Sequence, residues 1–197
     1  MDSNLSKLQP YPFEKLRELF SSGTQNQQLS NINLSIGEPK SPTPGFIKQA
    51  MADNLEYLAN YPKTKGELSL RTAISDWLIN RFSLPEDSID PEQHILPVNG
   101  TLFAIAQTVI DRNSKAKVLL PNPFYQIYEG AAYLAGADPV YIDFTVINDE
   151  VPGIDQVSEQ PWQQTQLVYI CTPSNPTGDI IPLATMQKLI KLAHQYD

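Results

Sequence analysis

The sequence is poor in cysteine and has no long apolar segment. Cys171 is its only cysteine, so no disulfide can form within the chain, and we expect an inert thiol buried at the end of an apolar run. No stretch is long and apolar enough to span a bilayer, and the N-terminus lacks the apolar core of a signal peptide. We therefore expect a cytoplasmic protein without a membrane partner.

Basic residues are scarce relative to acidic ones. The 197 residues include 14 lysines and arginines against 22 aspartates and glutamates, which gives a net charge of −8. A nucleic-acid partner is not expected, because phosphate backbones are bound by basic patches. Hydrophobic residues make up 41% of the chain, which is enough to build a core.

The most informative stretch runs from Gln166 to Gly178. Leu167 to Cys171 form a short apolar run that predicts a buried strand. The residues that follow include two prolines, a glycine and small polar side chains, which are typical of a loop. Asn175 would then lie at the carboxyl edge of a sheet, where open α/β sheets bind ligands. An ordinary turn between a strand and a helix is the alternative interpretation.

A second strand, turn and helix are predicted at residues 94–110. Residues 94–98 read as a strand, 99–101 as a tight turn and 102–110 as a mostly apolar helix. This layout directs free backbone N–H groups and a helix dipole at an anion. Gly100 and Thr101 are therefore candidates for holding a phosphate, and a helix start without a ligand is the alternative.

The remaining segments alternate between helical and extended patterns. Further strands are predicted at 32–36, 117–120 and 139–142, with an irregular connection from 143 to 164 that contains a short helix near 153–157. Helices are predicted at 13–20, 44–54, 68–78, 129–137 and from 182 onward. We expect the strands near 95–98, 117–120, 139–142 and 166–171 to join one mostly parallel sheet.

Taken in order, these motifs resemble the class I and II aminotransferases, which are pyridoxal 5′-phosphate (PLP) enzymes of fold type I. The likeness is strongest to the bacterial N-succinyldiaminopimelate aminotransferases. The matching elements are Gly37-Glu38-Pro39, the series Tyr61, Gly66 and Leu70-Arg71, the turn Asn99-Gly100-Thr101, the loop from Pro121 to Tyr128, and Asn175-Pro176-Thr177-Gly178.

The resemblance implies an architecture and a subunit arrangement. The fold would be a three-layer α/β/α structure with a mostly parallel sheet, truncated relative to the family. Residues 1–44 would form an N-terminal arm and part of a small domain, and residues 45–197 the N-terminal portion of the large PLP-binding domain. The full-length enzyme would be a homodimer.

The resemblance also implies roles for particular residues. Gly100 and Thr101 would hold the PLP phosphate, and Tyr125 would stack on the pyridine ring. Asn175 would hydrogen-bond the phenolic oxygen, and Tyr61 would reach the phosphate in the partner subunit. Gly37 would lie beside the substrate carboxylate. In this family the Asn-Pro bonds of both loops are often cis, so we expect cis peptides at 122–123 and 175–176.

The family's remaining catalytic groups lie after the Asn-Pro-x-Gly loop. They are the lysine that holds PLP as a Schiff base, an aspartate at the pyridinium nitrogen and an arginine for the substrate carboxylate. After Asn175 this sequence has only Lys188 and Lys191, which we predict on the solvent face of a helix. We therefore expect an N-terminal part of an aminotransferase, inactive alone, with its Schiff-base lysine beyond Asp197.

Several functions are compatible with this pattern. The first is transamination between an amino acid such as glutamate and a keto acid, for which the resemblance suggests N-succinyl-2-amino-6-oxopimelate of lysine biosynthesis. A PLP-dependent C–S lyase or synthase of the same fold is an alternative, as is a catalytically dead truncated chain. A nicotinamide-binding domain is disfavoured, because no Gly-x-Gly-x-x-Gly follows a strand.

Overall fold

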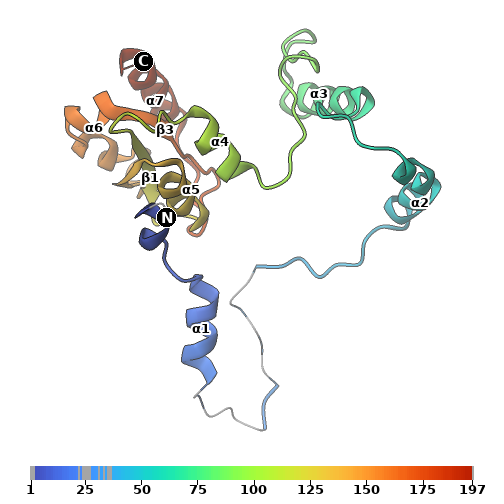
Figure 1. The fold of residues 1–197 in the computed structure, drawn as a ribbon, viewed down its shortest axis with the longest axis horizontal. Helices are drawn as coiled ribbons and strands as arrows, with labels where there is room; N and C mark the ends of the chain where they lie inside the picture. Colours follow the sequence, from blue (N-terminus) through green and yellow to red (C-terminus); the bar gives the residue numbers. More distant parts are fainter. Residues whose placement is uncertain are drawn as a thin grey trace. The chain divides into compact units, whose positions relative to one another are not determined.

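The computed structural model describes residues 3–21, 23, 28–30, 32, 34 and 37–196 (Figure 1). The chain divides into two compact units, one made of Met1–Asn26 with Gly100–Asp197 and the other of Gln27–Asn99. A domain boundary at residue 44 stays a prediction. No helix in the described part of the chain is long and apolar enough to cross a membrane.

The first unit is built on a three-stranded parallel sheet. Its strands are β1 (Lys117–Asn122), β2 (Asp138–Asp143) and β3 (Thr165–Val168), in the order β2-β1-β3. β1 pairs with β2 over its whole length, from Lys117 opposite Asp138 to Asn122 opposite Asp143. The apolar run Val118–Leu120 is fully buried, as expected for a central strand that is covered on both faces.

Two helices cover one face of this sheet. They are α4 (Thr101–Val109) and α5 (Ile127–Ala135), which form one hydrophobic cluster with Val118 and Leu120. The α5 side of the cluster consists largely of the fully buried Ala131, Ala132 and Ala135. Their small side chains allow the helix to lie close to the sheet. η1 (Ser3–Lys7) packs against α5, and α1 (Pro12–Ser21) follows it.

The opposite face is covered by η3 (Pro152–Gln156), α6 (Glu159–Gln164) and α7 (Leu183–Tyr196). They form a second cluster with Leu119 and Ile142, in which the indole of Trp162 is only 6% exposed. The ring of Trp162 stacks on Tyr196 with 6.3 Å between centroids. The sheet is therefore sandwiched between two helical layers, which confirms the predicted α/β/α architecture.

The second unit contains α2 (Gly45–Asp53), η2 (Leu55–Ala59) and α3 (Leu68–Phe82). Its buried side chains among the described residues are Arg71 and Ser75, which are both polar. Arg71 donates to the carbonyl oxygen of Pro91 at 2.6 Å and to the carboxylate of Glu92 at 3.0 Å. Hydrogen bonds rather than apolar packing therefore fasten α3 to residues 89–92.

The sequence-based element assignments need four corrections. Residues 95–98 are not a strand, because no strand in the described part of the chain pairs with them. β3 ends at Val168 instead of Cys171, although the Tyr169 N–H still donates to the Leu119 carbonyl at 2.9 Å. Cys171 is half-buried rather than buried. The helix α6 lies in the polar stretch that was expected to be irregular.

The predicted strand at 32–36 lies partly outside the described residues. Ile32 and Leu34 are described, and neither belongs to a strand. The other predicted elements are present, with boundaries that differ by at most four residues.

Candidate functional site

The N-terminus of α4 has the geometry of an anion site. Gly100 precedes the helix in the left-handed conformation, with φ 68° and ψ 50°. A Cβ at this position would meet no atom within 4 Å, so open space borders the turn. No side chain caps the helix start, and its first turn contains no acidic residue. The first-turn N–H groups, with the Thr101 hydroxyl beside them, therefore suit a phosphate.

A stack of tyrosines connects this helix start to the carboxyl ends of β1 and β3. The Tyr169 hydroxyl donates to the carbonyl oxygen of Leu102 at 3.0 Å. The Tyr128 ring stacks on the Tyr169 ring at 4.5 Å, and Tyr125 meets Tyr128 edge-on at 5.8 Å. One aromatic cluster thus fixes both the α4 N-terminus and the Tyr125 loop.

Burial disfavours the ionised form of the two inner tyrosines of this stack. It raises the pKa of Tyr128 to about 12 and also raises the pKa of Tyr169. Both side chains are buried, and the sequence did not reveal the anchoring role of Tyr169. The sequence places Tyr169 in the middle of the apolar run from Leu167 to Cys171, and nothing in that run distinguishes it as an anchor.

Tyr125 lies in the loop that leaves β1 and is half-buried. Its neighbour Phe124 stacks on Tyr141 at 5.6 Å, and the Tyr141 hydroxyl donates to the Glu129 carboxylate. Burial is the main cause that raises the pKa of Tyr141. These contacts hold the loop against α5 and β2, so the position of the Tyr125 backbone is set by the fold.

The Asn175 loop leaves the carboxyl end of β3 and is closed by backbone hydrogen bonds. Gly178 N–H donates to the Ser174 carbonyl at 2.7 Å, and Ser174 N–H donates to the Asp179 carbonyl at 2.8 Å. Asn175 itself is exposed. The peptide bonds at 122–123 and 175–176 are both cis, as predicted, and the bond at 172–173 is also cis.

The predicted site residues fall into two groups. Gly100, Thr101, Tyr125 and Asn175 belong to the first unit, and Tyr61 and Gly37 belong to the second. The Tyr61 side chain is 100% exposed, and Gly37 is exposed as well. The individual roles of all six residues remain predictions.

The two lysines that follow the Asn175 loop lie on α7, where one forms an ion pair and the other is exposed. Lys188 on α7 pairs with the carboxylate of Asp155 in η3, and 42% of its side chain is exposed. Lys191 is exposed on the same helix. Neither residue points to a covalent role.

Comparison with protein families and curated proteins gives consistent matches. The sequence model of the family described as "Aminotransferase class I and II" matches residues 30–197. An LL-diaminopimelate aminotransferase of Nitratidesulfovibrio vulgaris (strain DP4) is 29% identical over 98% of this chain and 50% of its own length. A protein of the same name from Desulforudis audaxviator is 28% identical over 98% of this chain and 49% of its own length.

Solved structures resemble the fold as well. An aminotransferase from Neisseria meningitidis Z2491 matches with a TM-score of 0.90 and 36% identity, over 100% of this chain and 50% of that one. The aminotransferase AspB from Helicobacter pylori 26695 matches with a TM-score of 0.84 and 34% identity, over 96% and 49% of the two chains. The chain thus spans about half the length of the relatives it matches.

Proposed function

Because the chain belongs to the class I and II aminotransferases, we propose that it forms the cofactor-holding part of a transaminase. PLP is the cofactor of this family. The proposed reaction transfers an amino group between an amino acid such as glutamate and a keto acid. The proposal includes a cytoplasmic homodimer, with a large PLP-binding domain that begins near residue 45.

The observation that carries this proposal is the first turn of α4. A glycine in the left-handed conformation, an uncapped helix start and the absence of acidic side chains in the first turn together favour a bound anion. The Thr101 hydroxyl adds a donor of the kind that phosphate oxygens accept. These residues fit the phosphate of PLP without needing a positive side chain.

The other predicted residues would complete the binding site for the cofactor and the substrate. Tyr125 would stack on the pyridine ring and hold it flat, and the Asn175 amide would donate to the phenolic oxygen. Tyr61 would hydrogen-bond the phosphate in the partner subunit, and Gly37 would admit the substrate carboxylate. When bound, PLP supplies an electron-withdrawing ring that acidifies the α-proton of the amino acid.

The proposed keto substrate is N-succinyl-2-amino-6-oxopimelate of lysine biosynthesis, with glutamate as the amino donor. Two curated relatives are named LL-diaminopimelate aminotransferases, and this supports substrates with a diaminopimelate backbone. Steady-state assays of a full-length enzyme that carries residues 1–197 would decide between the succinylated and free keto acids. A strong preference for aromatic donors would contradict both.

Residues 1–197 alone are proposed to bind PLP weakly and not to transaminate. The test titrates the purified chain with PLP and separately with inorganic phosphate, and follows ³¹P shifts and tyrosine fluorescence. Thr101→Asp places a negative charge at the α4 start and should abolish both titrations. Ser158→Asp places the same charge at the start of α6 and should leave them unchanged.

Three results would contradict the proposal. The first is anion binding that is insensitive to Thr101→Asp, which would place the phosphate elsewhere. The second is enzyme-dependent formation of glutamate from 2-oxoglutarate by residues 1–197, and the third is a borohydride-trapped PLP adduct on Lys188.

A further inference from the structure

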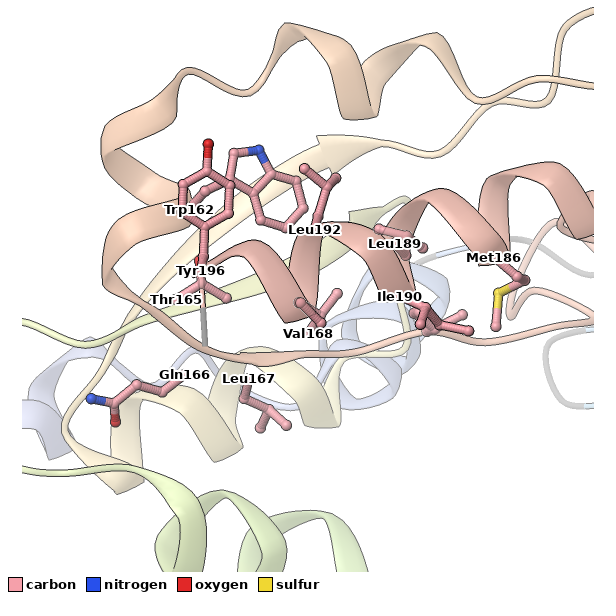
Figure 2. Close-up of a pocket in the computed structure, with 12 residues that line it drawn as sticks. Trp162, Thr165, Gln166, Leu167, Val168, Met186, Leu189, Ile190, Leu192 and Tyr196 are labelled. Carbon is pink, nitrogen blue, oxygen red and sulfur yellow. The ribbon is translucent and has the colours of Figure 1, made fainter.

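The side chain of Tyr169 lies on the face of the sheet opposite to α7. Its two neighbours in the chain, Val168 and Ile170, line an apolar groove of about 350 Å³ between β3 and α7 (Figure 2). Because successive side chains of an extended chain point to opposite faces, Tyr169 points to the other face. There it belongs to the cluster that α4 and α5 form, and it is 7% exposed.

Three contacts fix the position of Tyr169. Its backbone N–H donates to the Leu119 carbonyl of β1 at 2.9 Å. Its ring stacks on that of Tyr128, with 4.5 Å between centroids and 10° between the ring planes. Its hydroxyl donates to the Leu102 carbonyl of α4 at 3.0 Å. Because the backbone and the ring are already held, the hydroxyl forms its hydrogen bond at little further cost in side-chain entropy.

The helix that receives this hydrogen bond has few other anchors. Of the nine residues of α4, all of which the structure describes, only Ala106 is buried. The side chains of Ile105 and Val109 are 41% and 48% exposed. A helix of this length is marginal without tertiary contacts. The position of its first turn therefore depends strongly on the bond from Tyr169 to the Leu102 carbonyl.

The Leu102 carbonyl lies in the same turn as the candidate anion site. In the helix it accepts from the Ala106 N–H, and its second lone pair accepts from the Tyr169 hydroxyl. The same peptide group carries the Phe103 N–H, which is one of the first four N–H groups and has no acceptor within the helix. A hydrogen bond to a carbonyl polarises its peptide group and makes the N–H of that group a stronger donor. Tyr169 thus acts on a donor that is free to bind an anion.

Tyr169 is the donor of this hydrogen bond, because a carbonyl oxygen can only accept. A phenol is protonated at neutral pH, and burial raises the pKa of Tyr169 further above that range. The hydrogen bond therefore persists under the conditions in which a phosphate is charged. Since the hydroxyl is neutral, its effect on a bound anion comes through the peptide group and not through a charge of its own.

We propose that Tyr169 is a positioning residue for the anion site at the start of α4. Its hydroxyl holds the first turn in place and, through the Leu102 carbonyl, strengthens the Phe103 N–H as a donor to a phosphate oxygen. This inference rests on the proposed function, which places the phosphate of PLP at this turn. Tyr169 does not itself contact the phosphate, so its removal weakens the site without removing any of the groups that bind the anion.

The test titrates the purified chain with inorganic phosphate and measures the binding that Thr101→Asp abolishes. Tyr169→Phe keeps the ring and its stack but removes the donor, and it should weaken phosphate binding by about three- to tenfold. Tyr133→Phe is the matched control on α5. It removes a hydroxyl from a ring that contacts Lys7 instead of α4, and it should leave phosphate binding unchanged.

Amide NMR of the ligand-free chain separates polarisation from a general loosening of the helix. Tyr169→Phe should move the ¹⁵N resonance of Phe103 upfield and that of Leu102 less, because the Leu102 N–H shares its peptide group with the Thr101 carbonyl. Tyr169→3-fluorotyrosine carries a more acidic phenol, which is a stronger donor. It should move the Phe103 resonance downfield and tighten phosphate binding. A role in helix packing alone would produce neither change.

The possible failures distinguish this inference from the proposed function. Equal phosphate binding by the wild-type chain and Tyr169→Phe would overturn the inference and leave the proposed function standing. Equal displacement of the Leu102 and Phe103 resonances, or no tightening by Tyr169→3-fluorotyrosine, would also overturn it. The fluorinated variant retains the hydroxyl and its contacts, so it decides the question even if Tyr169→Phe does not fold. A wild-type chain that binds no phosphate would contradict both proposals.

Discussion

The contact between Arg71 and Glu92 shows how single side chains organise the second unit. Arg71 is 4% exposed and donates its hydrogen bonds to the Pro91 carbonyl and the Glu92 carboxylate, which lie 20 and 21 residues later in the chain. Lys65 adds a second cation, 2.7 Å from the other carboxylate oxygen of Glu92. The hydrogen bond from Arg71, followed by that from Lys65, lowers the pKa of Glu92 from 4.5 to about 2.

This lowered pKa predicts that the stability of the second unit depends on pH. A carboxylate whose folded pKa is depressed stabilises the fold fully above its ordinary pKa and ceases to do so as pH falls through the folded value. The contribution of Glu92 should therefore disappear between pH 4.5 and about 2. Carboxyl ¹³C NMR should show Glu92 titrating near 2 in the native chain.

The matched variants for this titration are Lys65→Gln and Lys63→Gln. Lys65→Gln should raise the pKa of Glu92 only partway, because Arg71 remains in place. Lys63→Gln should leave it unchanged, since Lys63 pairs with Glu67. A Glu92 that titrates at its ordinary value in the native chain would show that the contact does not form in solution.

Gly153 should be the glycine least tolerant of a side chain. A Cβ there would lie 2.0 Å from the backbone oxygen of Asp143, and neither segment can move without disturbing the cluster around Ile154. Gly153→Ala should lower the free energy of unfolding by about 2–3 kcal/mol in urea titrations. Gly130→Ala is the control, because its Cβ would meet Phe103 at an ordinary 3.6 Å. It should stabilise α5 by roughly 0.5–1 kcal/mol.

At the level of the element, α3 ends on a strained residue. Its C-cap is Ser83, which adopts the left-handed conformation with φ 51° and ψ 44°. The N–H groups of Ser83 and Leu84 both donate to the Ile79 carbonyl. This conformation satisfies the helix end but is unfavourable for a residue with a Cβ.

Two serine-to-glycine changes on this helix should therefore have opposite effects. Ser83→Gly should stabilise α3 by up to about 1 kcal/mol, because glycine adopts the left-handed conformation freely. Ser69→Gly, at an exposed position in the first turn of the helix, should destabilise it by up to about 0.5 kcal/mol. Circular dichroism during urea unfolding measures both. The same sign for both variants would mean that Ser83 is not left-handed in solution.

Elements whose signal is local could be predicted from sequence. The strand predicted at 117–120 and the helix predicted at 129–137 both formed, as β1 and α5. Residues 95–98 have an equally apolar pattern, but no strand in the described part of the chain pairs with them. A β-strand forms only where a neighbouring strand accepts and donates its backbone hydrogen bonds. α6 was missed because its sequence is polar and Pro161 suggested a break, although proline is tolerated in the first turn of a helix.

The residues of the candidate site also differ in whether the sequence alone could predict them. Gly100 and Asn175 stand in loops whose composition is informative without any structure. The link from Tyr169 to the Leu102 carbonyl joins residues 67 positions apart, and it depends on how β3 pairs with β1. No local pattern encodes such a contact.

At the level of the whole molecule, the two units differ in what holds them together. The first has two hydrophobic clusters around its sheet. In the described part of the second, no hydrophobic side chain is buried, and large apolar residues such as Phe46, Leu58 and Tyr61 are mostly exposed. The second unit should therefore be the less stable one.

Hydrogen exchange should reveal this difference directly. Amides of α2, η2 and α3 should exchange at least about tenfold faster than those of β1 and α5, because they open without breaking a buried cluster. Exchange followed by proteolysis and mass spectrometry measures both sets in one sample. Equal protection in the two units would show that the second acquires an apolar core in solution.

Each unit also contains one tryptophan, and the two indoles have opposite surroundings. Trp77 on α3 is 58% exposed, whereas Trp162 is 6% exposed in the cluster under α7. The two tryptophans should therefore differ in fluorescence. The emission of Trp77 should be red-shifted and quenched by acrylamide, and that of Trp162 should be blue-shifted and shielded from the quencher. Loss of the blue-shifted emission would report the unfolding of the first unit alone. The unfolding of each unit can thus be followed by its own emission wavelength, without an attached dye.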